Sequence, residues 1–168
     1  MASEAAPATA FVVRVPEAEA CVAAHVTVLY PFMAPASITP EVMARAEAAL
    51  RGLRAFDFQL SQLQRFADTS WLAPHPADPF VALTEALVRA FPEFPPFGGV
   101  HRDIVPHLSV ARGDEPTLQQ ADVELRAILH VHSPIRAHCG HLSLLAQADG
   151  RWLEWRRLPL DPTAPEGA

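Results

Sequence analysis

Two short motifs of the same form constrain this chain more than any other feature of its sequence. Residues 25–27 read His-Val-Thr and residues 107–109 read His-Leu-Ser, each inside an apolar run typical of a β-strand. Because a strand turns residues i and i+2 to one face, each motif presents an imidazole beside a hydroxyl, roughly 7 Å apart along the backbone. Two such strands facing one another would surround a phosphate, with imidazoles that take and give a proton and hydroxyls that bind its oxygens. The pattern therefore predicts a phosphodiester site that needs no metal ion.

The runs around these motifs resemble the signatures of a known family. The first run is HVTVLYPF at 25–32 and the second is PHLSVAR at 106–112. Together with PPFGG at 95–99 and the closing run at 152–160, they are similar to the two-histidine (2H) phosphoesterases, in the 2'-5' RNA ligase-like branch. The resemblance covers nearly the whole chain.

The resemblance implies an α+β fold with two lobes. Each lobe would be an antiparallel sheet flanked by helices, and pseudo-two-fold symmetry would bring the two histidines together in a central cleft. It implies catalytic roles for the four motif residues His25, Thr27, His107 and Ser109. The implied reaction is hydrolysis of 2',3'-cyclic or 2'-5'-linked nucleotide or RNA phosphodiesters, with 2'-5' RNA ligation as its reverse. We expect no cofactor, and a nucleotide or an RNA end as the binding partner.

Length and composition favour one domain. Half of the 168 residues are hydrophobic and 19% are charged, so the chain can bury roughly two thirds of its unfolded surface. We expect a single domain over 11–160, after a disordered segment at 1–10 and before a flexible tail at 161–168. No apolar run reaches the ~18 residues of a membrane span, and residues 1–10 lack the basic start of a secretory signal. We therefore expect a cytoplasmic monomer.

The charged residues argue against two classes of nucleic-acid protein. A net charge of −6 disfavours a basic surface that coats long nucleic acid, although it permits a small nucleotide or a single RNA end. All 13 basic residues are arginine, so the lysine that becomes adenylylated in ATP-dependent ligases is absent. A Gly-x4-Gly-Lys-Ser/Thr phosphate loop is absent as well. Any joining of ends would therefore reverse a phosphoryl transfer without nucleotide activation.

Hydrophobic periodicity predicts three helices among seven strands. One helix is expected from the N-cap Thr39 to Gly52, a second from Asp78 to Pro92, and a third from the cap Asp114 through Leu129. The expected strands are 11–15, 24–30, 56–66, 70–73, 105–111, 135–145 and 152–160. Each motif strand leads through a Pro-containing loop into an amphipathic helix, and this weak repeat predicts two half-domains.

Aromatic side chains offer the natural surface on which a nucleobase stacks. The candidates are Tyr30, Phe32, Phe66, Trp71 and Phe97, most of which we expect in the core. Strict alternation turns Tyr30 away from the side of His25 unless Pro31 ends the strand and re-aims it. Arg112 has the same parity problem relative to His107, although it could reach a phosphate from the end of the strand. The predicted substrate-binding residues are Tyr30, Phe66, Trp71 and Arg112.

Two rival hypotheses belong to other functional classes. One is a non-catalytic module for RNA ends or nucleotides, which would need the aromatic residues but not the histidine pair. The other is a metal-dependent hydrolase that uses the cluster His130, His132, His138, Cys139 and His141, whose ligand types suit zinc or copper. Its spacing matches no standard zinc pattern, and alternation would set His138 and Cys139 on opposite faces. We therefore favour ordinary histidines of an edge strand and expect no bound metal.

Overall fold

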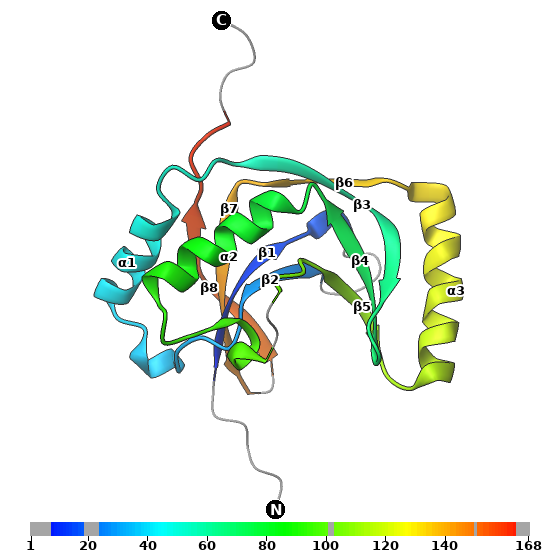
Figure 1. Ribbon diagram of the computed structural model, residues 1–168, viewed down its shortest axis with the longest axis horizontal. Coiled ribbons are helices and arrows are strands. Elements are labelled where there is room, and N and C mark those ends of the chain that lie inside the picture. Colours follow the sequence, from blue (N-terminus) through cyan, green and yellow to red (C-terminus); the bar gives the residue numbers. More distant parts are fainter. Residues whose placement is uncertain (1–7, 19–23, 101–102, 150, 164–168) are drawn as a thin grey trace, which may run out of the picture.

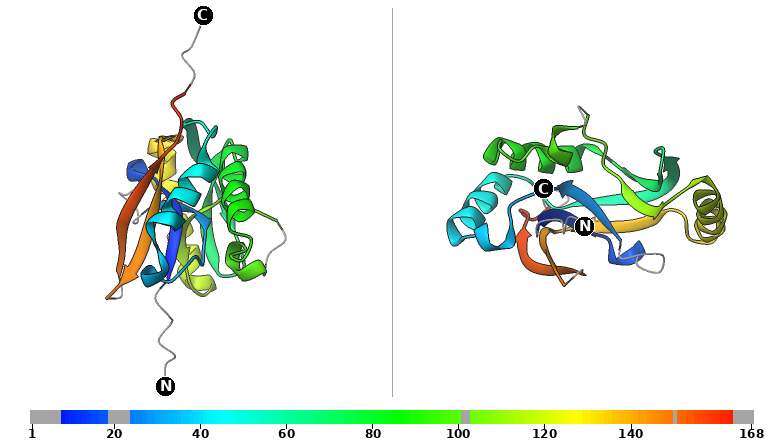
Figure 2. Two further views of the ribbon diagram at one scale, coloured as in Figure 1. Left: turned by 90° about the vertical axis from the view of Figure 1, so that its left-hand side faces the viewer. Right: turned by 90° about the horizontal axis from the view of Figure 1, so that it is seen from below.

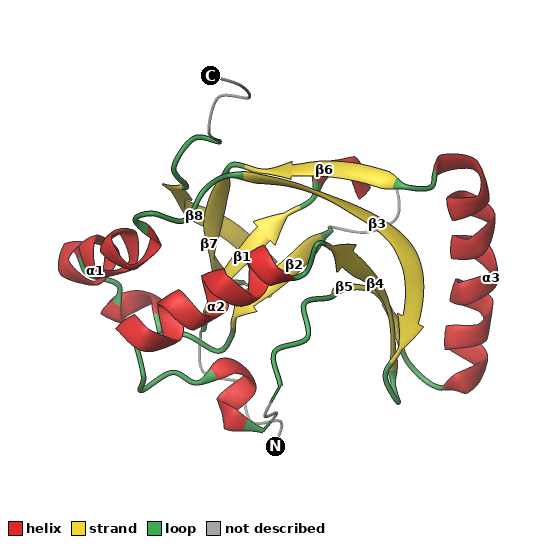
Figure 3. Ribbon diagram, turned by 45° about the horizontal axis from the view of Figure 1, so that its top comes forward, coloured by secondary structure: helices red, strands yellow, loops and turns green. Residues whose placement is uncertain are grey.

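Eight strands form one curled antiparallel sheet, and three helices flank it (Figures 1 and 3). The computed structural model describes residues 8–18, 24–100, 103–149 and 151–163. The strands are β1 Thr9–Arg14, β2 His25–Leu29, β3 Phe56–Arg65, β4 Thr69–His75, β5 Leu108–Arg112, β6 Ile135–Cys139, β7 His141–Ala148 and β8 Arg151–Pro159. The helices are α1 Pro40–Leu50, α2 Asp78–Ala90 and α3 Glu115–His132.

The order of the strands divides the sheet into two halves that meet at its centre. The order is β6-β3-β4-β5-β2-β1-β7-β8. Helix α3 packs against β3, β4 and β5, whereas α2 packs on β2 and on α1, and Figure 2 shows α3 at the opposite end of the molecule from α1 and α2. The α+β class is confirmed, but the expected two separate sheets are not. Val26 of β2 pairs with Leu108 of β5 and joins the halves into one sheet.

Local signals in the sequence placed the helices correctly. The Thr39 hydroxyl accepts a hydrogen bond from the Val42 N–H at the start of α1, and the Asp114 carboxylate accepts one from the Thr117 N–H at the start of α3. Both contacts satisfy backbone donors that have no partner within the helix. After α1, Gly52 adopts φ +84°, a left-handed conformation that favours glycine.

The predicted strand at 135–145 is in fact two strands, β6 and β7, separated by Gly140. They lie far apart in the sheet, because β6 pairs with β3 whereas β7 pairs with β1 and β8. The apolar positions fall on odd numbers before Gly140 and on even numbers after it. This change of phase marks the boundary between the two strands, and the single predicted strand overlooked it.

Both ends of the domain extend beyond the expected bounds 11–160. Thr9 and Ala10, which we expected in the disordered segment, belong to β1 and are buried. The Thr9 hydroxyl donates to the Met33 carbonyl over 2.7 Å. Asp161, expected in the flexible tail, accepts from the Ala55 N–H at 2.7 Å, and its carboxylate accepts from the Gly52 N–H at 2.9 Å. Residues 1–7 and 164–168 lie outside the described residues.

The hydrophobic core contains buried residues from the sheet and from all three α-helices. Phe32 is 5% exposed and packs its ring against Phe11, Phe91 and Phe94 at centroid distances of 4.9–5.1 Å. Phe32 is therefore a core residue and offers no stacking surface. Among the described residues, no helix is both long and apolar enough to cross a membrane.

Candidate functional site

The two His-x-hydroxyl motifs lie on neighbouring strands at the seam between the halves of the sheet. The middle residues of the motifs, Val26 and Leu108, are the register partners that join β2 to β5. Both are buried, at 0% and 1% exposure. Since successive residues of a strand point to opposite faces, the residues on either side of them face away from the core.

The antiparallel register fixes how the four motif side chains are arranged. Continued by one residue in each direction, it sets His25 opposite Ser109 and Thr27 opposite His107. Opposite residues of such a pair are about 4.5–5.5 Å apart and diagonal ones about 7–8 Å. All four side chains line one cavity of about 720 Å³. Each imidazole therefore has a hydroxyl from the other motif beside it.

Contacts from four directions orient the His107 ring. Its Nδ1 lies 2.7 Å from the Val105 carbonyl oxygen, which can only accept, so Nδ1 carries the hydrogen. Phe66 and Trp71 meet the ring edge-on at centroid distances of 5.1 and 5.8 Å, and Phe97 stacks on it at 6.2 Å. In the neutral ring, Nε2 is then the nitrogen that can accept a proton.

Phe66 and Trp71, both predicted to bind substrate, occupy different positions. Trp71 is only 8% exposed and stacks against Phe66 at 4.8 Å. It supports Phe66 and His107 from behind and does not offer a free face for a nucleobase. Phe66 is 39% exposed and lines a cavity of about 550 Å³ that shares His107, Phe97 and Arg112 with the main cavity.

Tyr30 and Arg112 both line the main cavity, despite the parity of their positions. Strand β2 ends at Leu29, so alternation no longer constrains Tyr30. On β5, the pairing with β4 shifts so that Ser109 and Ala111 face adjacent residues of β4. The bulge reverses the alternation and brings Arg112 to the side of Ser109. The Arg112 Nε donates to the Thr69 hydroxyl at 3.3 Å.

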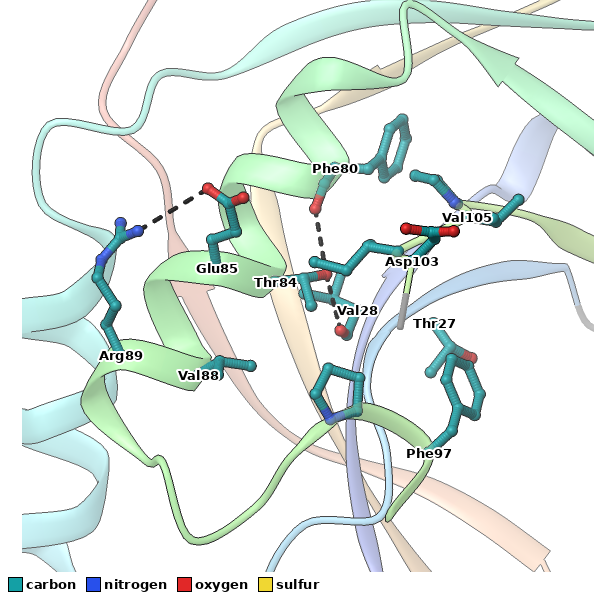
Figure 4. A pocket seen from close by; sticks show the side chains of 13 residues that line it. Thr27, Val28, Phe80, Thr84, Glu85, Val88, Arg89, Phe97, Asp103 and Val105 are labelled. Carbon is teal, nitrogen blue, oxygen red and sulfur yellow. Dashed lines mark hydrogen bonds and ion pairs between the residues drawn. The ribbon is translucent and has the colours of Figure 1, made fainter. Parts of the chain in front are cut away.

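A third, smaller cavity of about 320 Å³ adjoins the site at Thr27 (Figure 4). It lies among β2, α2 and the segment 103–106, and its walls are mostly apolar. The Thr84 hydroxyl donates to the Val28 carbonyl at 2.8 Å and so ties α2 to β2 beside it. Thr27 and Phe97 line both cavities, so the space around the motif continues behind Thr27.

Four charged or aromatic residues that the sequence analysis did not select as site residues also line the main cavity: Arg14, Phe97, Trp152 and Glu154. Arg14 is the register partner of His25 across β1 and β2. Trp152 and Glu154 come from β8, which β7 connects to β1. The available signals were two runs that carry the resemblance, because Phe97 lies in PPFGG and both Trp152 and Glu154 lie in 152–160. Only strand pairing shows that Arg14, Trp152 and Glu154 are neighbours of the motifs.

Glu154 is held as an anion by its neighbours. Its carboxylate accepts from Arg157 Nε at 2.8 Å, from Arg157 Nη2 at 3.0 Å and from the buried Ser143 hydroxyl at 2.7 Å. These bonds, with the hydrogen bond from Arg157 first, lower the pKa of Glu154 to about 2. The carboxylate therefore remains charged at every pH at which a histidine pair could work.

We expect this carboxylate to contribute an acid-sensitive part of the stability. Because its pKa is about 2 in the folded protein and near 4.5 when exposed, its contribution is full above pH 4.5 and disappears as the pH falls towards 2. Solvent screening limits the contribution to about 1–2 kcal/mol. Urea unfolding of wild type and Glu154→Gln should differ by that amount at pH 6 and by much less at pH 2.5. A difference in unfolding free energy that stays constant between these pH values would contradict this prediction.

The proposed cluster of metal ligands near the C-terminus is not assembled. His130 and His132 lie in the last turn of α3, not on an edge strand as expected. His138 on β6 has its Nδ1 2.6 Å from the Asp57 carboxylate, and Cys139 is buried on the opposite face, as alternation predicted. Burial raises the pKa of the Cys139 thiol to about 12. Within the described residues, no group of three or more His, Cys, Asp or Glu side chains could hold a metal ion.

Comparisons with protein-family models and with solved structures agree with this geometry. Residues 5–151 match the sequence model of the 2'-5' RNA ligase superfamily. No curated protein sequence matches the chain.

Solved structures share the fold at low sequence identity. E. coli LigT complexed with 3'-AMP has a TM-score of 0.59 and 17% identity, over 92% of this chain and 98% of that one. A phosphoesterase has a TM-score of 0.61 and 14% identity over the same shares. The protein TT0787 of Thermus thermophilus has a TM-score of 0.61 and 13% identity, over 94% of this chain and 100% of that one.

Proposed function

The chain belongs to the 2'-5' RNA ligase superfamily, and on that premise we propose that it is a metal-independent phosphodiesterase of 2',3'-cyclic or 2'-5'-linked nucleotide or RNA phosphodiesters. The observation that carries this proposal is the arrangement of the two motifs, whose four side chains line one cavity from neighbouring strands. The complex of E. coli LigT with 3'-AMP adds support, because 3'-AMP is a nucleotide monophosphate of the kind that such hydrolysis releases.

The two imidazoles divide the proton transfers between them. In hydrolysis of a 2',3'-cyclic phosphate, a neutral imidazole removes a proton from the water molecule as its oxygen attacks phosphorus. The other imidazole, protonated, gives its proton to the ribose oxygen as the bond from that oxygen to phosphorus breaks. The hydroxyls of Thr27 and Ser109 donate hydrogen bonds to the non-bridging oxygens, on which negative charge increases in the transition state.

The same site would join RNA ends if a ribose hydroxyl replaced water as the nucleophile on a 2',3'-cyclic phosphate. The base would then remove the proton of that hydroxyl and the acid would protonate the ribose oxygen that leaves. Cleavage of the 2'-5' bond so formed is the reverse reaction, in which the acid and the base exchange roles, as microscopic reversibility requires. The absence of lysine from the chain agrees with this route, because it uses no adenylylated enzyme. In dilute aqueous solution we expect hydrolysis to predominate.

We expect turnover to survive EDTA and to show a bell-shaped dependence on pH, because one histidine must be neutral while the other is charged. The assay is a panel of 2',3'-cyclic nucleotides and 2'-5' dinucleotides in the presence of EDTA. The position of the phosphate in the product, 2' or 3', identifies the ester oxygen that leaves. Loss of activity in EDTA with recovery on addition of zinc would support the metal-dependent alternative, and binding of the panel without turnover would support the non-catalytic one.

A further inference from the structure

The cavity of about 550 Å³ that Phe66 lines opens beside the catalytic motifs, on the β4 side of the site. It shares Phe97, His107 and Arg112 with the main cavity, so the two spaces are continuous. The Phe66 ring is 39% exposed, and the buried Trp71 stacks against it at 4.8 Å and supports it. A nucleotide whose phosphate lies between the motifs can therefore extend its base into this cavity and stack it on an aromatic ring.

Asp68 adds a carboxylate to the wall of this cavity. It lies in the turn between β3 and β4, two residues after Phe66. Two backbone hydrogen bonds hold the turn. The Phe66 N–H donates to the Thr69 carbonyl at 2.9 Å, and the Gly113 N–H donates to the Asp68 carbonyl at 3.1 Å. The backbone that carries the aromatic ring and the carboxylate is therefore fixed from both sides.

The contacts of the Asp68 side chain leave acceptor positions for a ligand. Its Oδ1 accepts from the Thr69 hydroxyl at 2.9 Å, and this hydroxyl, in a residue only 1% exposed, accepts in turn from Arg112 Nε at 3.3 Å. Its Oδ2 lies 3.7 Å from Arg112 Nε, which is longer than a hydrogen bond, and the Asp68 side chain is 66% exposed. Since a carboxylate has about four acceptor positions, both oxygens can accept further hydrogen bonds.

The distance from the motifs to Asp68 suits a single nucleotide. Trp71 on β4 is the register partner of Ser109. Asp68 precedes Trp71 by three residues, which corresponds to roughly 10 Å of extended chain. A mononucleotide spans a comparable distance from its phosphate to the far edge of its base. A base that belongs to a phosphate between the motifs would therefore bring its Watson–Crick edge to the Asp68 carboxylate.

We propose that Asp68 selects guanine as the base of the substrate. Guanine presents two parallel donors, its N1–H and its N2 amino group, and the two oxygens of one carboxylate accept both. Adenine and cytosine each present one amino donor beside an unprotonated ring nitrogen, whose lone pair the second oxygen repels. Uracil presents its N3–H between two carbonyl oxygens, which the carboxylate also repels. This inference rests on the proposed function for the position of the phosphate.

The test compares three nucleotides that differ only in the edge of the purine: the 3'-monophosphates of guanosine, inosine and adenosine. Isothermal titration calorimetry at constant ionic strength measures the dissociation constants and needs no turnover. We expect the wild type to bind the guanosine compound about tenfold more tightly than the adenosine compound. The inosine compound keeps N1–H but lacks the N2 amino group, so its affinity should be intermediate.

Asp68→Asn should reverse this preference, so that the adenosine compound binds more tightly than the guanosine compound. The physical reason is that an amide accepts from the N6 amino group of adenine and donates to its N1. A merely structural role of the carboxylate would not produce the reversal. In Asp68→Ala the three affinities should agree within about twofold. Both variants should unfold close to the wild-type temperature, because the side chain is mostly exposed.

Two control variants separate this role from general electrostatics. Asp57→Asn removes the same charge from an exposed side chain of β3 outside this cavity. Asp103→Asn removes the other carboxylate of its wall, which does not belong to the turn that carries Phe66. Both should keep the preference for the guanosine compound.

Four results would each overturn the inference: equal affinities of the wild type for the three nucleotides, absence of binding, an unchanged order of affinities in Asp68→Asn, or loss of the preference in Asp103→Asn. Failure of the proposed function would instead appear as absence of turnover in the substrate panel.

Discussion

Alanine in place of either motif histidine should lower kcat for a 2',3'-cyclic nucleotide by about a thousandfold or more. Each replacement removes a proton acceptor or a proton donor that the reaction needs at phosphorus. The double variant His25→Ala/His107→Ala should be little worse than either single variant, because the pair acts as one catalytic unit. The measurement is kcat for the wild type, the two single variants and the double variant on the best substrate of the panel.

The fold should tolerate these replacements, which makes the activity loss interpretable. His25 is exposed and His107 is half-buried, so thermal unfolding of each variant should remain close to that of the wild type. His138→Ala is the matched control, since His138 lies on β6 at an edge of the sheet and binds Asp57. Full activity in His138→Ala would support catalysis by His25 and His107. Activity that depends on His138 but not on His25 would transfer the catalytic centre to the C-terminal histidines.

Removal of a motif hydroxyl should have the next largest effect. We expect Thr27→Ala and Ser109→Ala each to lower kcat by roughly ten- to a thousandfold, because each loses one hydrogen-bond donor to a non-bridging oxygen of the transition state. KM should change much less than kcat, since the donors act on charge that increases during the reaction. Steady-state kinetics on the same cyclic nucleotide would measure both constants.

Two further variants test whether the hydroxyl itself is responsible. Ser109→Thr keeps the donor and should keep most of the activity, unlike Ser109→Ala. Ser61→Ala removes an exposed hydroxyl of β3 that lies outside the cavity and should have no effect. Wild-type kcat in both Thr27→Ala and Ser109→Ala would mean that these residues serve only the strands.

Predictions from the sequence succeeded where the cause of a structure lies within a few neighbouring residues. The N-caps Thr39 and Asp114 begin helices because their side chains bind backbone donors three residues ahead. The period of two in each motif turns histidine and hydroxyl to one face, and the apolar residues between them, Val26 and Leu108, lie in the core. The break at Gly140 was missed because the residues on both sides of it alternate as in a strand, although the apolar positions change there from odd to even numbers.

The neighbours of the motifs depended on strand pairing. Arg14 and Glu154 lie beside the site because β1 pairs with β2 and because β8 follows through β7. Arg112 reaches the cavity through a bulge between β4 and β5 that no periodicity in its own strand reveals. Trp71 became a buried support because Phe66 stacks on it.

The sequence by itself thus determined the groups on which the proposed chemistry rests: two imidazoles and two hydroxyls, with one of each presented on one face of each motif strand. The tertiary structure decided which residues surround them and how far the cavity extends. The physical reason is that the alternation of a strand is a local property, set by backbone geometry over two residues. Register and bulges between distant strands follow instead from the packing of the whole sheet.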